Sequence, residues 1–106
     1  MIEITKRADT ETLSKIFKAL SNENRLEIFN LVRQGVGNCC QIDELGDRCS
    51  CVCDLGAEMN LALSTVSHHL KELRNAGLIH CQKRGQWVYC SVNETTLELI
   101  EDFIKD

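Results

Sequence analysis

The segment from residue 52 to residue 92 constrains the fold most, because the spacing of its apolar residues changes from two helical patterns to two strand patterns. Residues 52–59 have the pattern of a short helix, and residues 65–76 have the pattern of a second helix with one apolar stripe. Gly77 ends the second helix, since glycine readily adopts the left-handed conformation common after helix C-termini. Two short helices joined by a tight turn predict a helix-turn-helix over residues 52–76. The apolar stripe consists of Val66, Leu70 and Leu73.

A hairpin pattern follows the helix-turn-helix. Residues 78–81 and 87–92 have the composition of two strands, and between them lies a basic turn, Lys83-Arg84-Gly85-Gln86. A basic turn beside a helix-turn-helix is what a wing uses to contact DNA phosphates or the minor groove. We therefore predict that residues 78–92 form a wing.

Helical patterns also occupy both ends of the chain. Residues 10–20 and 26–32 carry apolar positions at helical spacing, and a Ser-Asn pair at 21–22 can cap the second of these helices. A last helix is predicted over residues 94–104, with its apolar residues on one face. Residues 35–50 show no sustained period and are expected to form a loop that carries several cysteines.

Together these elements predict a mainly α-helical fold with one small β-hairpin, a winged helix-turn-helix that occupies residues 1–106 as a single domain. The chain has 106 residues, 43% of them hydrophobic, which suffices for one core but makes a domain of marginal size. An apolar helix at each end can pair two subunits, so we expect a homodimer formed through the N- and C-terminal helices. The candidate interface residues are Leu13, Phe17, Leu97 and Ile100.

Charge is distributed unevenly along the chain. The formal net charge is -4, which argues against a protein that binds nucleic acid over its whole surface. From Ser64 to Val92, however, there are four basic residues and one acid, whereas the segment from Glu94 to Asp106 holds five acids and one lysine. The negative charge therefore lies away from the segment that we expect to contact DNA.

The second helix of the helix-turn-helix has the composition of a recognition helix. Short polar side chains near its start can donate to base edges or phosphates of double-stranded operator DNA while the apolar stripe packs inward. Ser64 is expected to cap its N-terminus, and His69 is expected to pack against the neighbouring helix. The alternative is that the polar face and the basic turn are only hydrated surface. The predicted DNA contacts are Ser64, Thr65, Ser67, His68, Lys71, Arg74, Lys83 and Arg84.

Seven cysteines are unusual in a chain of this length, and five of them lie between Cys39 and Cys53. The N-terminal segment is charged and has no signal-peptide core, and no apolar run is long enough to span a membrane. We therefore expect a cytoplasmic protein, with no membrane partner, in a reducing compartment. There, a dense cluster of thiols suits metal coordination or redox chemistry better than structural disulfides.

Three sequence motifs carry a resemblance to a known family: Cys51-Val52-Cys53-Asp54-Leu55, Ser64-Thr65-Val66-Ser67-His68-His69-Leu70 and Ala76-Gly77-Leu78. They resemble the ArsR-type (ArsR/SmtB) family of metalloregulatory transcriptional repressors, in particular its arsenic-responsive branch. The resemblance covers most of the chain and implies a dimeric winged helix that represses resistance genes until metal binds at the Cys-Val-Cys-Asp-Leu motif.

The chain also departs from that family in its cysteines. Arsenic-sensing members usually place a third cysteine directly after the leucine of the motif, where this chain has Gly56. Cadmium- and lead-sensing members use further cysteines from an N-terminal arm, whereas this chain has none before Cys39. Cys49 lies two residues before the motif, so a third thiolate is nevertheless close in sequence.

Thiolates select soft, thiophilic ions over magnesium or calcium. A regular helix turns about 100° per residue, so it would point Cys51 and Cys53 to nearly opposite sides. The start of such a helix would have to unwind before both thiolates could bind one ion. Ion capture would then displace the recognition helix and lower the affinity for DNA.

These observations predict a DNA-binding transcriptional repressor, not an enzyme, that releases its operator when Cys51, Cys53 and Cys49 bind arsenite or antimonite. Cys39 or Cys40 can replace the third ligand, and no organic cofactor is expected. One alternative is a repressor of the same fold that responds to cadmium, lead or zinc, and another is a repressor that senses thiol oxidation or persulfide.

The cysteines have two further candidate roles. The paired cysteines of the motif can instead be small buried hydrophobic residues. A catalytic cysteine is disfavoured because no acidic residue is placed to orient a histidine base and a helix-turn-helix has no deep cleft.

Cys81 and Cys90 belong to the hairpin. They fall opposite each other around the basic turn, and Ile79, Val88 and Val92 share their face. Core packing is the favoured role for this pair, with a second ligand pair or a redox switch as the alternative. The last helix holds acidic residues but no histidine, so the zinc site that some relatives carry on this helix is not expected.

Overall fold

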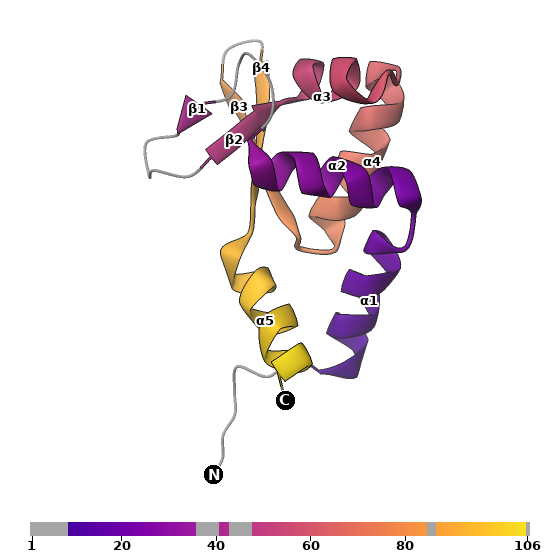
Figure 1. The fold of residues 1–106 in the computed structure, drawn as a ribbon, viewed down its shortest axis with the longest axis vertical. Helices are drawn as coiled ribbons and strands as arrows, with labels where there is room; N and C mark the ends of the chain where they lie inside the picture. Colours follow the sequence, from indigo (N-terminus) through magenta and orange to yellow (C-terminus); the bar gives the residue numbers. More distant parts are fainter. Residues whose placement is uncertain (1–8, 36–40, 43–47, 85–86, 106) are drawn as a thin grey trace.

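The computed structural model describes residues 9–35, 41–42, 48–84 and 87–105. Within these ranges the chain forms a mainly helical winged helix-turn-helix, as predicted (Figure 1). Its elements are α1 (Thr10–Leu20), α2 (Glu23–Gln34), β1 (Gln41–Ile42), β2 (Arg48–Cys51), α3 (Val52–Met59), α4 (Leu63–Asn75), β3 (Ile79–Arg84), β4 (Trp87–Val92) and α5 (Glu94–Lys105).

Side-chain caps define the starts of the first two helices. The Asp9 carboxylate accepts a hydrogen bond from the Thr12 backbone N–H at 2.8 Å, and the Asn22 side chain accepts one from the Arg25 N–H at 3.0 Å. Each cap satisfies a backbone donor that lacks a partner inside its helix. The cap expected between the first two helices is thus confirmed at Asn22.

The start of α4 differs from the prediction. Ser64 does not cap this helix, because the helix already begins at Leu63 and its N-cap is Ala62, which makes no side-chain hydrogen bond. The chain enters α4 from a tight turn in which Asn60 has a φ of 56°. Asparagine tolerates this left-handed conformation better than most residues, so the turn geometry sets where the helix begins.

The end of α4 matches the prediction. Gly77 has a φ of 79°, and its N–H donates to the carbonyl of Arg74 at 2.9 Å. The Leu78 N–H donates to the carbonyl of Leu73 at 3.0 Å, and both leucine side chains are fully buried. This hydrogen-bond pattern, with an apolar contact across it, is a Schellman motif that turns the chain from α4 into the wing.

The region expected to be a loop contains two short strands. β1 and β2 extend the β3–β4 hairpin into a four-stranded sheet with the order β1-β2-β4-β3. β2 pairs antiparallel with β4, so that Ser50 lies opposite Cys90 and Cys51 lies opposite Tyr89. Strands of two and four residues are too short to show a period in the sequence, and the partner of β2 lies about 40 residues further along the chain.

The hydrophobic core lies where α2, α4 and the sheet meet. α2 contacts α1, α3 and α4 as well as β2 and β4, so it joins the helix-turn-helix to the sheet. In Figure 1 it crosses the middle of the molecule, with the sheet and α3 above it and the terminal helices α1 and α5 below. The fully buried side chains are those of Ile16, Ile28, Val32, Leu55, Val66, Leu73, Leu78, Ile79 and Cys90.

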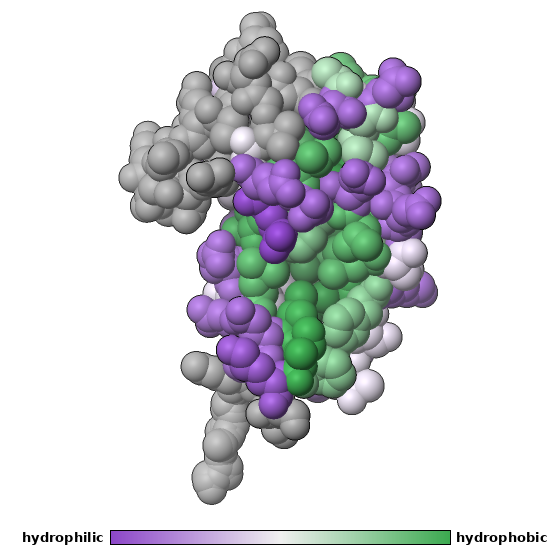
Figure 2. Space-filling model, viewed as in Figure 1, coloured by the Kyte–Doolittle hydropathy of each residue, from purple (hydrophilic) through white to green (hydrophobic). Residues whose placement is uncertain are grey.

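The terminal helices leave apolar side chains uncovered. Phe17 of α1 and Phe103 of α5 stack with ring centroids 5.7 Å apart, yet they remain 40% and 54% exposed. Ile104, one residue further, is 71% exposed. Figure 2 shows hydrophobic residues gathered over this lower half of the molecule, below the polar surface of α2.

Candidate functional site: a nucleic-acid interface and two groups of thiols

The recognition helix α4 separates its polar and apolar residues cleanly. Val66, His69, Leu70 and Leu73 are buried, whereas the predicted DNA-contacting residues are exposed apart from Thr65, which is partly buried. The polar side chains therefore remain available to base edges and phosphates, which is the arrangement a recognition helix requires. The exposed residues are Ser64, Ser67, His68, Lys71 and Arg74.

The wing is the β3–β4 hairpin. Lys83 lies near the end of β3 and is exposed, and Arg84 is the last residue of that strand. The side chain of Arg84 lies outside the described part of the structure, as do residues 85–86 of the turn. The contacts predicted for Lys83 and Arg84 stay predictions, with the strand positions now known.

His69 lies on the buried face of α4, as expected, with 8% of its surface exposed. Its Nδ1 atom has no hydrogen-bond partner among the described residues. Burial lowers the pKa of His69, and the nearby positive charges of Arg25 and His68 lower it further. The imidazole is thus held in its neutral form and packs on the buried side of α4, opposite the exposed polar residues.

The thiols of the motif lie at a junction between strand and helix. Cys51 is the last residue of β2, and Cys53 is the second residue of α3. The helix begins at Val52, as predicted, so Cys51 lies before it and there is no helical turn at Cys51 that must unwind. The reason is the pairing of β2 with β4, which holds Cys51 in extended backbone opposite Tyr89.

The other predicted ligands are placed less completely. Cys49 lies in β2, opposite Gln41 of β1. Cys39 and Cys40 lie outside the described residues, as do the side chains of Cys49, Cys51 and Cys53. In the part of the chain with described side chains, no three histidine, cysteine, aspartate or glutamate residues gather into a metal-binding group.

Gly56 lies where α3 and the turn before α4 approach each other closely. A Cβ atom at this position would lie 3.1 Å from Cδ2 of Leu63 and 3.3 Å from the carbonyl oxygen of Leu61. Gly56 itself is buried, so α3 and the turn before α4 approach each other through its missing side chain. A side chain here would require Leu63 or the backbone at Leu61 to shift by a few tenths of an ångström. Glycine itself has no thiol, so any third ligand must come from elsewhere.

Cys81 and Cys90 form a second thiol group, on the wing. Their Sγ atoms lie 3.3 Å apart, and the residues are directly opposite in the β3–β4 register, as predicted. Cys90 is fully buried and Cys81 partly so. The hydrogen bond with Cys90 lowers the pKa of Cys81 to about 7, and the guanidinium of Arg74 adds to this effect against the opposing influence of burial.

The residues predicted to form the dimer lie on the open apolar face. Phe17 is exposed, whereas Leu13, Leu97 and Ile100 are partly buried. Phe103 and Ile104 were not predicted as interface residues, although they are more exposed than any of these. The sequence did contain a signal for these two residues, because both fall on the last turn of a helix whose apolar residues are predicted to share one face.

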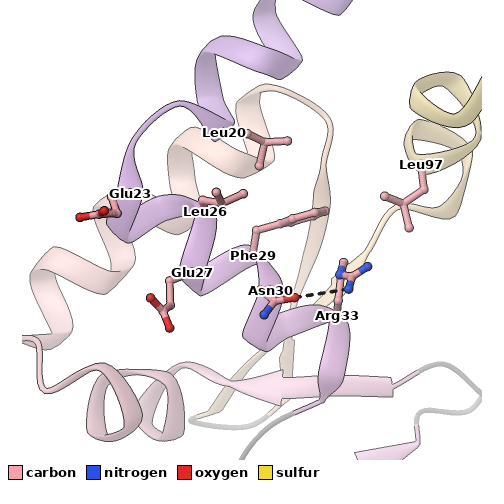
Figure 3. A pocket seen from close by; sticks show the side chains of 8 residues that line it. All are labelled: Leu20, Glu23, Leu26, Glu27, Phe29, Asn30, Arg33 and Leu97. Atoms are coloured by element: carbon pink, nitrogen blue, oxygen red, sulfur yellow. Dashed lines mark hydrogen bonds between the residues drawn. The ribbon is translucent and has the colours of Figure 1, made fainter. Parts of the chain in front are cut away.

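A hollow of about 510 Å³ continues this face between α2 and α5. Figure 3 shows Leu20, Leu26 and Phe29 along one side and Leu97 of α5 opposite them. Glu23 and Glu27 rim the hollow, and Arg33 donates a hydrogen bond to Asn30 at 3.3 Å beside it. The hollow is shallow and mixed in polarity, so it extends the apolar surface without forming an enclosed ligand site.

The amphipathic second helix, the tight turn and the basic hairpin define the chain as a winged helix-turn-helix protein, a class that binds DNA. Residues 42–80 match the family model described as "Bacterial regulatory protein, arsR family". A cadmium resistance transcriptional regulatory protein, CadC of Listeria innocua, is 38% identical over 95 residues, which cover 88% of this chain and 69% of that protein. The chain therefore belongs to the ArsR family and is a transcriptional regulator.

Other similar proteins bear different names. A putative arsenical resistance operon repressor of Halobacterium salinarum is 32% identical over 87 residues, which cover 82% of this chain and 64% of that protein. The solution structure of a homodimeric winged helix-turn-helix DNA-binding domain from Mycobacterium bovis superposes with a TM-score of 0.63 at 24% identity, covering 91% of this chain and 80% of that one. No helix within the described ranges is long and apolar enough to cross a membrane.

Proposed function

We propose that this regulator is a homodimeric repressor that releases its operator when the thiolates of Cys49, Cys51 and Cys53 bind arsenite or antimonite. The observation that carries the proposal is the position of the motif at the junction of β2 and α3. One side of that junction is paired with the wing, and the other leads into the helix-turn-helix. An ion bound there would act on both DNA-reading elements.

The donor set fits a soft ion. Cys49 and Cys51 are two positions apart on β2, the spacing at which residues of a strand share a face, and Cys53 follows within the first turn of α3. Three sulfur donors favour thiophilic ions over hard cations. The start of α3 also stabilises the thiolate form, because its free N–H groups and dipole favour negative charge. When bound, the ion supplies a rigid bridge between strand and helix.

The coupling to DNA runs through described contacts. β2 holds β4, the second strand of the wing, through the pairs Ser50–Cys90 and Cys51–Tyr89. α3 packs against α4, and Leu55, four residues after Cys51, is fully buried between them. Drawing Cys51 and Cys53 together therefore shifts the wing, the recognition helix or both. Such a shift would move the DNA-contacting residues and thereby lower operator affinity.

The DNA contacts follow from the exposed polar face of α4 and from the wing. Ser64, Thr65, Ser67 and His68 stand near the start of the helix, where a recognition helix reads bases. Lys71 and Arg74 extend the helix contact, and Lys83 and Arg84 of the wing contact phosphates or the minor groove.

The dimer is supported by the open apolar face of α1 and α5. A monomer that leaves Phe17, Phe103 and Ile104 exposed has much to gain by burying them against a second copy. The homodimeric state named for the Mycobacterium bovis domain is consistent with this. Leu13, Leu97 and Ile100 complete the proposed interface.

Cadmium, lead or zinc is the alternative inducer, and the name of the Listeria innocua relative favours cadmium. A cadmium site of four thiolates would add Cys39 or Cys40 to the three proposed ligands. Gly56 does not discriminate between the ions, because glycine offers no thiol to any of them. The ligand count therefore separates these inducers.

The test is operator release followed by fluorescence anisotropy with purified protein and a panel of arsenite, antimonite, cadmium, lead, zinc and peroxide. Cys51→Ser and Cys53→Ser should still bind the operator but respond to the inducing ion far more weakly than wild type. We expect a loss larger than the roughly 10- to 100-fold that loss of an outer-shell partner costs a metal site. Thiolate charge-transfer absorption should report three ligands for arsenite and four for cadmium.

The matched control is Cys81→Ser, which removes a partly buried thiol outside the proposed site and should leave ion response unchanged. A Cys51→Ser protein that still releases its operator with wild-type sensitivity would remove the motif from the inducer site. Release by peroxide alone, with no ion effective, would favour the thiol-oxidation alternative.

A further inference from the structure

The cysteine pair of the wing stands at a special position in the β3–β4 ladder. The Asn93 N–H donates to the carbonyl of Leu78 at 2.9 Å, so these opposed residues form a hydrogen-bonded pair. Such pairs alternate with non-hydrogen-bonded ones along an antiparallel ladder. Cys81 and Cys90 lie three steps further along the same register and therefore form a non-hydrogen-bonded pair.

That position suits a disulfide. The Cα atoms of non-hydrogen-bonded pairs lie about 4.5 Å apart, with their side chains close together. Disulfides span Cα separations of roughly 4.4–6.8 Å, so the two strands need little movement to accept one. The Sγ atoms are already 3.3 Å apart.

The surroundings of the pair single out the thiol that reacts first. Cys90 is fully buried, whereas Cys81 is partly exposed and can meet a small oxidant. With its pKa lowered to about 7, a large fraction of Cys81 is thiolate at neutral pH. The thiolate is the nucleophilic form of cysteine.

Arg74 connects this pair to the recognition helix. Its guanidinium lies close enough to Cys81 for its positive charge to help lower the pKa of that thiol, although Arg74 belongs to the last turn of α4 and is exposed. The arginine that would extend the DNA contact is therefore partly engaged by a thiolate of the wing. Removing the thiolate charge leaves the arginine free for a DNA phosphate.

We propose that Cys81 and Cys90 form a redox site of the wing, in which a two-electron oxidant such as hydrogen peroxide joins them in a disulfide and thereby frees Arg74 to bind DNA. This site is separate from the proposed ion site. Ser50, rather than a cysteine, lies opposite Cys90 on β2, so the ladder offers no third thiol in that row.

The chemistry balances in two steps. The Cys81 thiolate attacks one peroxide oxygen, an S–O bond forms, the O–O bond breaks, and the departing hydroxide takes up a proton to become water. The Cys90 sulfur then attacks the resulting sulfenic acid, the S–S bond forms, and the S–O bond breaks. Hydroxide leaves with the Cys90 proton as a second water. The two cysteines lose two electrons, which the peroxide gains.

The experiment uses the full chain, reduced or treated with hydrogen peroxide. Peptide mapping by mass spectrometry should find the peptides of Cys81 and Cys90 joined, two hydrogens lighter, and separated again by dithiothreitol. Operator affinity should rise roughly two- to fivefold on oxidation, the size of effect expected when one partly exposed ion pair is lost. The plot of log affinity against log salt should steepen by about one unit for each arginine freed.

Three variants isolate the site. Cys51→Ser/Cys53→Ser lacks two proposed ion ligands and should keep the whole oxidation response, so the failure of either proposal can be told from the failure of the other. Cys81→Ser should lose the crosslink and the affinity change, and Cys90→Ala provides a second test if the serine perturbs the wing. Arg74→Gln should form the crosslink yet show no change in affinity or salt dependence.

Two results would overturn the proposal. The first is peroxide-treated protein that is oxidised at other cysteines but contains no Cys81–Cys90 crosslink. The second is a crosslinked protein whose operator affinity and salt dependence equal those of the reduced form.

Discussion

The helix-turn-helix and the terminal helices of this protein differ in how completely one chain can bury them. Around α4, Leu55, Val66 and Leu73 are fully buried by α2, α3 and the sheet. At the terminal helices, Phe17 and Phe103 stack on each other but keep about half their surface exposed. A single subunit thus buries the apolar residues of its helix-turn-helix, whereas its terminal helices leave apolar side chains exposed. We therefore expect mutations in the helix-turn-helix and mutations in the terminal helices to have different effects, the first on folding stability and the second on dimer formation.

The largest effect, on the free energy of unfolding, should come from a mutation in the helix-turn-helix. Leu73→Ala removes a fully buried side chain, so the free energy of unfolding should fall by about 2–5 kcal/mol through lost burial and the remaining cavity. Urea denaturation at one fixed protein concentration measures it, since unfolding of a dimer depends on concentration. The matched control is Leu63→Ala on the same helix, where the side chain is 52% exposed and the change should stay within about 0.5 kcal/mol. Equal losses in the two variants would mean that the two leucines are not buried as described.

A smaller effect, on assembly, should come from the ends. Phe17→Ser removes an aromatic ring that is 40% exposed in one subunit, and we expect the dimer dissociation constant to rise about 30-fold, as for a central interface residue worth about 2 kcal/mol. Analytical ultracentrifugation across a concentration series measures this. Leu63→Ala again serves as the control and should leave the dimer unchanged. Wild-type protein that sediments as a monomer at micromolar concentration would contradict the contrast between the two regions.

The same contrast shows which parts of the fold the sequence could specify. Elements defined by local signals were predicted well. The helix end at Gly77, the cap at Asn22 and the apolar stripes of the helices each depend on residues only a few positions away. The register that sets Cys81 opposite Cys90 also followed from the position of the turn. Local chemistry is visible in a sequence without knowledge of distant partners.

Features set by distant contacts were missed. β2 becomes a strand only because β4 lies beside it, so the sequence did not show that Cys51 ends a strand while Cys53 belongs to α3. Ser64 has the chemistry of a cap, but after the turn at Asn60 the helix α4 begins two residues too early for Ser64 to cap it. The sequence shows that Gly56 offers no ligand, and only the structure shows how closely Leu61 and Leu63 approach it. The DNA, ion and dimer residues remain predictions.

The smallest effect should be a pH dependence of the free energy of unfolding that comes from the helix-turn-helix. His69 of α4 is the one titratable residue among the buried polar side chains that the structure describes. Burial, with Arg25 and His68 nearby, lowers its folded-state pKa below the ordinary value of 6.5. Between the two pKa values the unfolded chain binds more protons than the folded one. The stability that His69 contributes is therefore complete above pH 6.5 and declines as the pH falls toward the folded-state pKa.

We expect the free energy of unfolding to fall between pH 7 and pH 5, a range that lies above the ordinary pKa values of carboxylates. His69→Leu replaces the imidazole with an apolar side chain of similar size and should remove this part of the pH dependence. His68→Leu, at the exposed neighbouring position, should retain it. Urea denaturation of the three proteins at pH 7, 6 and 5 makes the measurement. If His68→Leu abolished the acid sensitivity and His69→Leu kept it, the titrating group would lie on the DNA-reading surface and not beneath it.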